Sequence, residues 1–192
     1  MKQLLIFLLI STVIIGINTG KDRQIITKDK WVSDLITVAK RTTTYNNKYP
    51  KNLLYYDGTY WSADCVNIMK ALFNGRNIND WTIKGFQRDL TNTGDITTEQ
   101  MIEKCSSVSS NFKLLKEGEP RILHLKGHIG GYLGKNVIIN GAIYNVVEAT
   151  GSFGRKIAFS WVDNDGTRRD RKGGYLNGKW TRHGLPTRWV KY

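Results

Sequence analysis

The sequence predicts an α+β domain in which N-terminal helices pack on a central antiparallel β-sheet. Up to about residue 105, apolar residues recur at helical spacing, whereas after residue 120 short β-prone segments alternate with glycine-containing turns. Helices followed by a run of antiparallel strands are typical of an α+β domain rather than of alternating β-α units. The 192-residue chain has the length of one ordinary domain once a targeting segment is set aside.

Residues 1–20 have the pattern of a secretory signal peptide. A basic start is followed by an apolar run from Leu4 to Ile15 and by small residues from Gly16 to Gly20. The alternative is a membrane anchor, but the apolar run is shorter than the roughly 20 residues that a spanning helix needs. We therefore expect residues 21–192 to form a single secreted, extracellular domain without a stable membrane anchor.

Two helices besides the one that carries Cys65 are predicted. In Asp29–Lys40, Trp31, Leu35, Val38 and Ala39 share one face, and Asp29 is in place to cap the helix. Residues 97–100 resemble a capping box ahead of a helix over 101–105. Between these helices, residues 42–52 read as a loop, 53–56 as a short extended segment and 75–94 as irregular.

Cys65 begins the most clearly helical stretch of the chain. Apolar side chains at Cys65, Ile68, Met69, Leu72 and Phe73 follow helical spacing, and Gly75 supplies a stop signal. A thiol in the first turn of a helix lies at the positive end of the macrodipole, which stabilises the nucleophilic thiolate. The other interpretation is a buried structural cysteine, because free cysteine is among the most buried residue types.

The second half of the chain predicts a meander of short strands separated by turns such as 134–136 and Asn140-Gly141. A turn is expected at 117–120, and the expected strands are Arg121–Leu125, Ile129–Leu133, Val137–Ile139, Ile143–Glu148, Arg155–Trp161 and Thr187–Tyr192.

The formal net charge of +13 favours anionic partners, such as nucleic acid, an acidic lipid surface or a bacterial cell-wall polymer. Nucleic-acid binding would normally bring a basic motif interleaved with aromatic residues, which the chain lacks, so we expect no nucleic-acid partner. The densest basic cluster, Arg168–Lys172, reads as a solvated loop.

The two cysteines, Cys65 and Cys105, are not a disulfide scaffold for a domain of this size. A bridge between them would also forbid catalysis by Cys65. Cys105 is expected to pack in the core. The histidines and cysteines lack the spacing of a metal site, so we expect neither a metal nor another cofactor.

A nucleophilic thiol needs a base, and His128 is the best placed of the three histidines. It follows Gly127 at the start of a predicted strand, whereas His124 lies inside a strand and His183 lies near the C-terminus. Glu148 ends the strand after the following turn, and two antiparallel neighbours can place these side chains next to each other. A carboxylate there would fix the imidazole tautomer. Without a catalytic role, His128 would be a polar residue at a strand end and Glu148 a solvent-facing carboxylate.

Four pieces of the chain together resemble the NlpC family of papain-like cell-wall peptidases, over about residues 56–192. An Asp-Cys pair before a helix, a Gly-His-Ile-Gly strand start and an acidic residue on the next strand occur in the family's order. The pieces are 60–67, 98–109, 127–134 with 146–150, and 180–186.

The resemblance implies a papain-like fold and hydrolysis of an amide bond in the peptide stems of bacterial peptidoglycan, usually between D-glutamate and the following diamino acid. Carried over by position, Cys65 is the nucleophile, His128 the general base and Glu148 the residue that orients the imidazole. Tyr60 is a weaker match to a tyrosine that helps to stabilise the oxyanion. Peptidoglycan is the implied partner, and we expect a monomer.

Two departures from the commoner family pattern bear on these expectations. Asp-Cys-Val-Asn stands where Asp-Cys-Ser-Gly is more usual, as in a subset of the family, so the substrate pocket can differ. Glu148 stands where a histidine is frequent, and a carboxylate there favours the imidazolium. Two other functions remain open: a wall-binding protein without catalysis, and a papain-like amidase or transacylase that acts on another amide.

Overall fold

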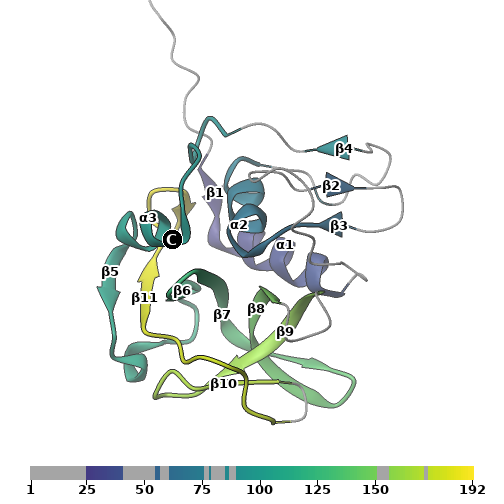
Figure 1. The fold of residues 1–192 in the computed structure, drawn as a ribbon, viewed down its shortest axis with the longest axis vertical. Helices are drawn as coiled ribbons and strands as arrows, with labels where there is room; N and C mark the ends of the chain where they lie inside the picture. Colours follow the sequence, from purple (N-terminus) through teal and green to yellow (C-terminus); the bar gives the residue numbers. More distant parts are fainter. Residues whose placement is uncertain are drawn as a thin grey trace, which may run out of the picture.

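A seven-stranded, mostly antiparallel sheet with three helices packed against it forms the body of the molecule (Figure 1). The structure, a computed structural model, describes residues 25–40, 55–56, 61–75, 78, 85–86, 90–150, 156–170 and 173–192. The α+β class is therefore confirmed. The expected signal peptide at 1–20 lies outside the described residues, and within them no helix has the length and apolar character to cross a membrane.

Helix α1 (Lys28–Lys40) buries the face that the sequence predicts, with Trp31, Leu35 and Val38 inside the core. The expected cap at Asp29 is wrong. The helix begins one residue earlier, and the Thr27 hydroxyl accepts a hydrogen bond from the Lys30 N–H at 3.2 Å. Thr27 therefore satisfies one of the free N–H groups at the helix start.

Helix α2 (Cys65–Phe73) confirms the prediction and is buried along most of its length. The Asp64 carboxylate caps it by accepting from the N–H groups of Val66 at 3.1 Å and Asn67 at 2.8 Å. The Asn67 amide also donates to Asp64 at 2.9 Å, so Asn67 fixes the capping side chain. The helix ends before Gly75, whose φ of 75° an L side chain rarely adopts.

Helix α3 (Thr98–Glu103) carries the predicted capping box between Thr97 and Gln100. It begins three positions earlier than expected and stops before Cys105, because a box at Thr97 starts the helix at residue 98. Cys105 therefore packs from beyond the helix end. A Cβ built on Gly184 would lie 2.6 Å from that of Cys105.

The order of strands in the main sheet is β10-β9-β8-β7-β6-β11-β5. Strands β6 to β9 follow each other as the predicted meander, and β10 pairs with β9 at one edge. Strand β11 returns to pair with β6 and carries β5 at the other edge. The sequence missed β5, β10 and β11, and the short 3-10 helix η1 (Phe112–Leu114) separates β5 from β6. The strands are β5 (Ser106–Ser109), β6 (Arg121–Leu125), β7 (His128–Ile139), β8 (Ala142–Thr150), β9 (Lys156–Val162), β10 (Arg168–Arg169) and β11 (Arg182–Leu185).

Strand β7 is one long strand where the sequence predicts two. Its pairing with β8 shifts register between Tyr132 and Val137, and Gly134 in that interval has a φ of 64°. An irregularity inside the strand accommodates the glycine that the sequence reads as a turn. The hairpin turn is instead at Asn140-Gly141, as predicted, with φ values of 51° and 79°.

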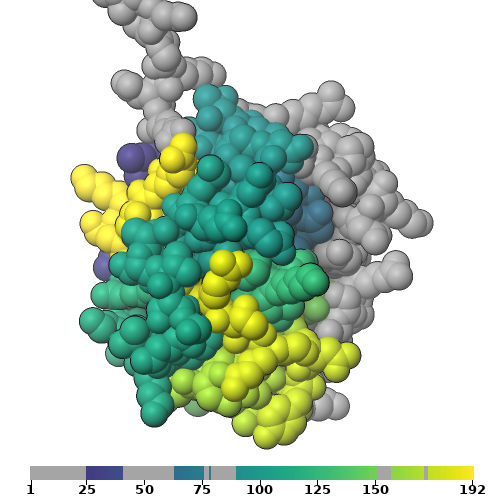
Figure 2. Space-filling model, turned by 60° about the vertical axis from the view of Figure 1, so that its left-hand side comes forward, coloured from purple at the N-terminus to yellow at the C-terminus, as the bar shows by residue number. Residues whose placement is uncertain are grey.

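Two small sheets complete the fold. Strand β1 (Ile26–Thr27) pairs in parallel with β12 (Val190–Lys191), so the expected final strand is shorter than 187–192. The yellow C-terminal residues accordingly reach the purple N-terminal ones in Figure 2. Strands β2 (Tyr55–Tyr56), β3 (Trp61–Ser62) and β4 (Gly85–Phe86) form the other sheet, in the order β3-β2-β4.

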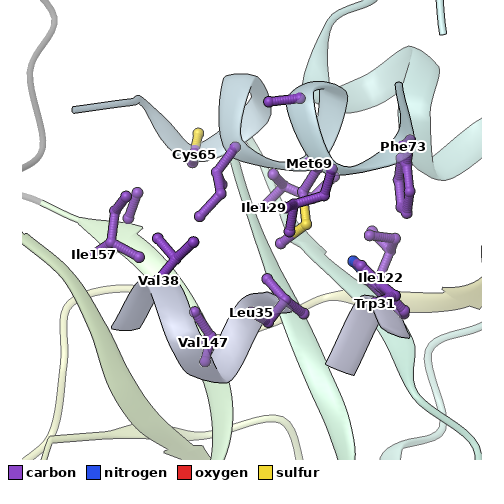
Figure 3. Packing of buried hydrophobic residues seen from close by; sticks show 14 of the residues in the cluster. Trp31, Leu35, Val38, Cys65, Met69, Phe73, Ile122, Ile129, Val147 and Ile157 are labelled. Carbon is purple, nitrogen blue, oxygen red and sulfur yellow. The ribbon is translucent and has the colours of Figure 1, made fainter. Parts of the chain in front are cut away.

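The two faces of the main sheet bury different clusters. The larger core fills the space between the sheet and helices α1 and α2 (Figure 3). A smaller cluster covers the opposite face and consists of Phe112, Leu123, Tyr132, Val146, Val162 and Trp180. Two consecutive glycines of β7 lie between these clusters, and their positions point to opposite faces of the sheet. A Cβ on Gly131 would lie 2.7 Å from Leu35 in the larger core, and a Cβ on Gly130 would lie 2.9 Å from Trp180 in the smaller cluster.

Candidate active site

Cys65 stands in the first turn of α2, against the start of β7. Its sulphur accepts a hydrogen bond from the backbone N–H of Ile129, the residue that follows His128. Both cysteines are free thiols in this structure.

Burial opposes the ionisation of Cys65 that its position at a helix start suggests. Desolvation, together with the neighbouring Asp64 carboxylate, raises the pKa of Cys65 to about 12, although the N–H groups of Ile129, Val66 and Cys65 act to lower it. The helix end therefore favours the thiolate only weakly against burial, and the thiol is protonated at neutral pH. A nucleophilic role for Cys65 would therefore require a separate base to take its proton.

Asp64 both caps α2 and raises the pKa of the Cys65 thiol, and two substitutions can separate these roles. We expect Asp64→Asn to keep the cap but to remove a charge that raises the thiol pKa, so that Cys65 reacts with iodoacetamide at pH 8 about tenfold faster. We expect Asp64→Ala to give the same acceleration and to cost about 1 kcal/mol of stability through the lost cap. Peptide mapping and urea unfolding measure the two effects, and an unchanged alkylation rate in both variants would refute the role of the charge.

His128 and Glu148 lie together on neighbouring strands. The imidazole Nε2 is 2.7 Å from Glu148 Oε2. Gly130 is the direct partner of Glu148 in the β7–β8 ladder, so His128 reaches the carboxylate diagonally across a position that has no side chain. The two residues that the sequence assigns as base and orienting group are therefore in hydrogen-bond contact.

The partners of Glu148 fix the imidazole tautomer. Glu148 is fully buried and receives three donors, namely His128, the Ser160 hydroxyl at 2.5 Å and the Arg168 guanidinium. Burial alone would raise the pKa of Glu148, but the hydrogen bond from His128 and the charge of Arg168 outweigh burial and lower it. An ionised Glu148 only accepts, so His128 donates from Nε2 and keeps the lone pair of its neutral form on Nδ1.

Trp180 closes the site from the outer face of the sheet. Its ring stacks on the His128 imidazole, with centroids 5.3 Å apart and planes 14° apart. Gly130 permits this approach, because a Cβ there would lie 2.9 Å from the indole and 3.3 Å from the Cβ of Glu148. Trp180 is buried, so the ring restricts both the rotation of His128 and the access of water.

Arg168 is the functional candidate that the sequence analysis missed. The expected solvated loop at 168–172 is wrong for its first two residues, since Arg168 and Arg169 form strand β10, and Arg168 is buried and bonded to Glu148. Arg171 and Lys172 lie outside the described residues. The sequence did not indicate this role, because runs of charged residues usually face solvent. The partner, Glu148, is 20 positions away and is apparent only in the folded chain.

In the described part of the chain, the two other histidines have no hydrogen bond with Cys65, His128 or Glu148. The ring of His183 is buried between the Arg121 guanidinium, 3.2 Å from Nδ1, and the Asn111 carbonyl, 3.0 Å from Nε2. His124 lies between Glu99 at 3.6 Å and Arg182 at 3.4 Å. Both sets of contacts join separate segments of the chain, which is a structural role. Within the described ranges no group of histidine, cysteine and carboxylate side chains could hold a metal ion.

The structure therefore joins two of the four sequence candidates directly and places the third beside them. Among the described residues no hydrogen bond connects the Cys65 sulphur to the His128 ring, although the sulphur contacts the adjoining peptide. Such contacts are often long in enzymes without substrate. Tyr60 lies outside the described residues.

A thiol, an imidazole oriented by a carboxylate and a helix N-terminus are the groups that nucleophilic acyl transfer requires. Comparison of the chain with protein-family models, with curated proteins and with solved structures finds no match.

Proposed function

We propose that this protein is a secreted cysteine endopeptidase of the NlpC type, with a papain-like fold, that hydrolyses an amide bond in the peptide stem of bacterial peptidoglycan. The observation that carries the proposal is the His128–Glu148 hydrogen bond at 2.7 Å, on the strand whose next N–H binds the sulphur of Cys65. A buried carboxylate held by three donors orients a histidine more firmly than a structural role at a strand end requires.

The first step transfers the thiol proton of Cys65 to Nδ1 of His128, and the sulphur attacks the carbonyl carbon of the stem peptide. Collapse of the tetrahedral intermediate breaks the C–N bond, and His128 returns the proton to the departing amine. Water, deprotonated by His128, then hydrolyses the thioester and restores the thiol. Glu148 remains ionised throughout and stabilises the imidazolium that forms transiently.

The Asp64 cap limits which backbone N–H groups at the start of α2 can bind the oxyanion. Asp64 already accepts from the N–H groups of Val66 and Asn67, which leaves the N–H of Cys65 itself for the oxyanion. Tyr60 is the second donor in this proposal, on the strength of the family resemblance.

The substrate follows from charge and resemblance together. The net charge of +13 attracts an anionic polymer such as the cell wall, an attraction that salt weakens. The resemblance points to the bond between D-glutamate and the diamino acid, to secretion through the segment 1–20, and to a catalytic domain at 21–192 that acts as a monomer.

The buried thiol favours one other candidate function. A Cys65 pKa of about 12 is what a structural cysteine has, and a wall-binding protein without catalysis would retain the basic surface. That protein would have no use for a carboxylate that orients His128, so we rank it second.

Digestion of purified peptidoglycan separates these possibilities. We expect the mature protein to release stem-peptide fragments with a new amino terminus at the diamino acid, as read by mass spectrometry, and Cys65→Ala to release none. Cys105→Ala serves as the matched control and should cleave like the wild type. Equal fragments from wild type and Cys65→Ala, or none from either, would refute a cysteine hydrolase. Binding of both proteins to the wall without fragments would support the wall-binding protein, and cleavage of another amide would indicate an amidase.

A further inference from the structure

Arg168 has more contacts with this site than the proposed chemistry requires. Its side chain is 4 % exposed, and its two terminal nitrogens donate to different partners, one to Glu148 and the other to the carbonyl of Asn177. The guanidinium carbon lies 4.9 Å from the centre of the Trp180 ring, on which His128 also stacks. A guanidinium buried to this extent is costly unless it is paired, and here its carboxylate partner is the group that orients His128.

The geometry sets Arg168 and His128 in competition for one carboxylate oxygen. Both donate to Oε2 of Glu148, and Nη2 of Arg168 lies 3.4 Å from Nε2 of His128. Both nitrogens carry protons directed at Glu148, so this short separation is a contact between donors and not a hydrogen bond. A second positive charge on the imidazole would therefore face the guanidinium at close range.

We propose that Arg168 is a positioning residue, which fixes the Glu148 carboxylate toward His128 and offsets its negative charge so that His128 rests as a neutral base. This inference rests on the proposed function for the role of His128. A lone carboxylate partner favours the imidazolium, which the sequence alone led us to expect. An imidazolium cannot accept a proton, whereas the protonated Cys65 thiol requires a base that can.

Among the described residues, Arg168 is the cation in contact with the His128 ring. Helix α3 contributes Glu99, which accepts from the N–H of Gly127 at 3.0 Å, and β6 contributes His124, whose own pKa burial lowers. Helix α2 contributes Asp64 and the neutral Cys65. The carboxylates in this set favour an imidazolium, so among the described residues Arg168 is the group that opposes them.

The test compares three variants by nuclear magnetic resonance of the imidazole carbons, with the His128 signal assigned by its loss in His128→Gln. We expect Arg168→Gln to move the protonation midpoint of His128 upward by about one pH unit. Arg168→Lys keeps the charge and should move it less. Arg169→Gln is the matched control, because Arg169 pairs with Asp163 at 2.6 Å and has no contact with Glu148, so its midpoint should equal that of the wild type.

Peptidoglycan digestion supplies an independent reading. In Arg168→Gln the acid limb of the pH–rate profile should move to higher pH, so that activity falls about tenfold at pH 6 and recovers toward pH 8. A purely structural role would lower the rate equally at every pH and leave the midpoint in place, which would overturn the inference.

The resonance titration still tests the inference if the wild type is inactive or if Arg168→Gln does not fold. If the wild type digests no peptidoglycan, the proposed function fails while the resonance titration still tests the arrangement of charges. If Arg168→Gln does not fold, the wild-type spectrum decides, because an imidazolium at pH 7 would contradict the proposal and a neutral ring with its proton on Nε2 supports it.

Discussion

His128→Gln is expected to reduce the hydrolysis of peptidoglycan by about a thousandfold or more, since general base catalysis contributes roughly that factor. Glutamine can still donate to Glu148, so the buried carboxylate keeps a partner and the fold is retained. What is lost is the lone pair on Nδ1 that takes the thiol proton in the proposed mechanism. Initial rates of fragment release measure the loss, and circular dichroism checks that the variant folds.

The other histidines provide the control for this prediction. His124→Gln and His183→Gln alter structural contacts with Glu99 and Asn111, respectively, and not the proton path. We expect either variant to lose stability while its rate at a temperature well below unfolding stays within a few-fold of the wild type. If His128→Gln behaved like these two variants, His128 would not be the base.

Gly130→Ala is expected to lower activity about a hundredfold, although it adds a single methyl group. The new carbon would lie 2.9 Å from the Trp180 indole and 3.3 Å from the Cβ of Glu148, so the ring has to move off the imidazole. A displacement of about 1 Å of a catalytic group is enough for such a loss. The rate of fragment release and the ring-current shift of the His128 resonance measure the effect together.

Gly131→Ala is the matched control on the opposite face of the same strand. Its Cβ would lie 2.7 Å from Leu35 and 3.3 Å from Met69, inside the large core. Overpacking there should cost about 1–3 kcal/mol of unfolding free energy while the remaining folded protein stays active. Equal activities of the two variants per folded molecule would contradict the part that we assign to the Trp180 stack.

The sequence predicted elements well where a strong period coincides with a local start or stop signal. Helix α2 matches its expected bounds because Asp64 caps it and Gly75 ends it, both within one turn of the helix. Strand β5 was missed because its serine-rich residues have no apolar alternation to detect. In β7, Gly134 looks like a turn residue, and only the partner strand determines that the chain continues through it.

In the candidate site, too, the features set by local sequence were predictable and those set by tertiary packing were not. The His128–Glu148 contact was foreseeable, since two strands joined by one hairpin bring them to the same end of the sheet. The burial of Cys65 was not, because helix position says nothing about which segments cover the thiol. Arg168 was hidden for a related reason, since its neighbours in sequence are charged and its partners lie on β8 and in the segment before Trp180.

The pairing of β1 with β12 has a consequence for the order in which the site is assembled. Trp189, next to β12, stacks on Phe73 of α2 with ring centres 5.0 Å apart, so a segment far along the chain from α2 completes the core beside that helix. Native contacts that span almost the whole described chain make the contact order high and folding slow. Helix α2 lacks this packing partner until the segment that holds Trp189 has been synthesised. The helix that carries Cys65 thus completes its packing against the core only after β12 has joined β1.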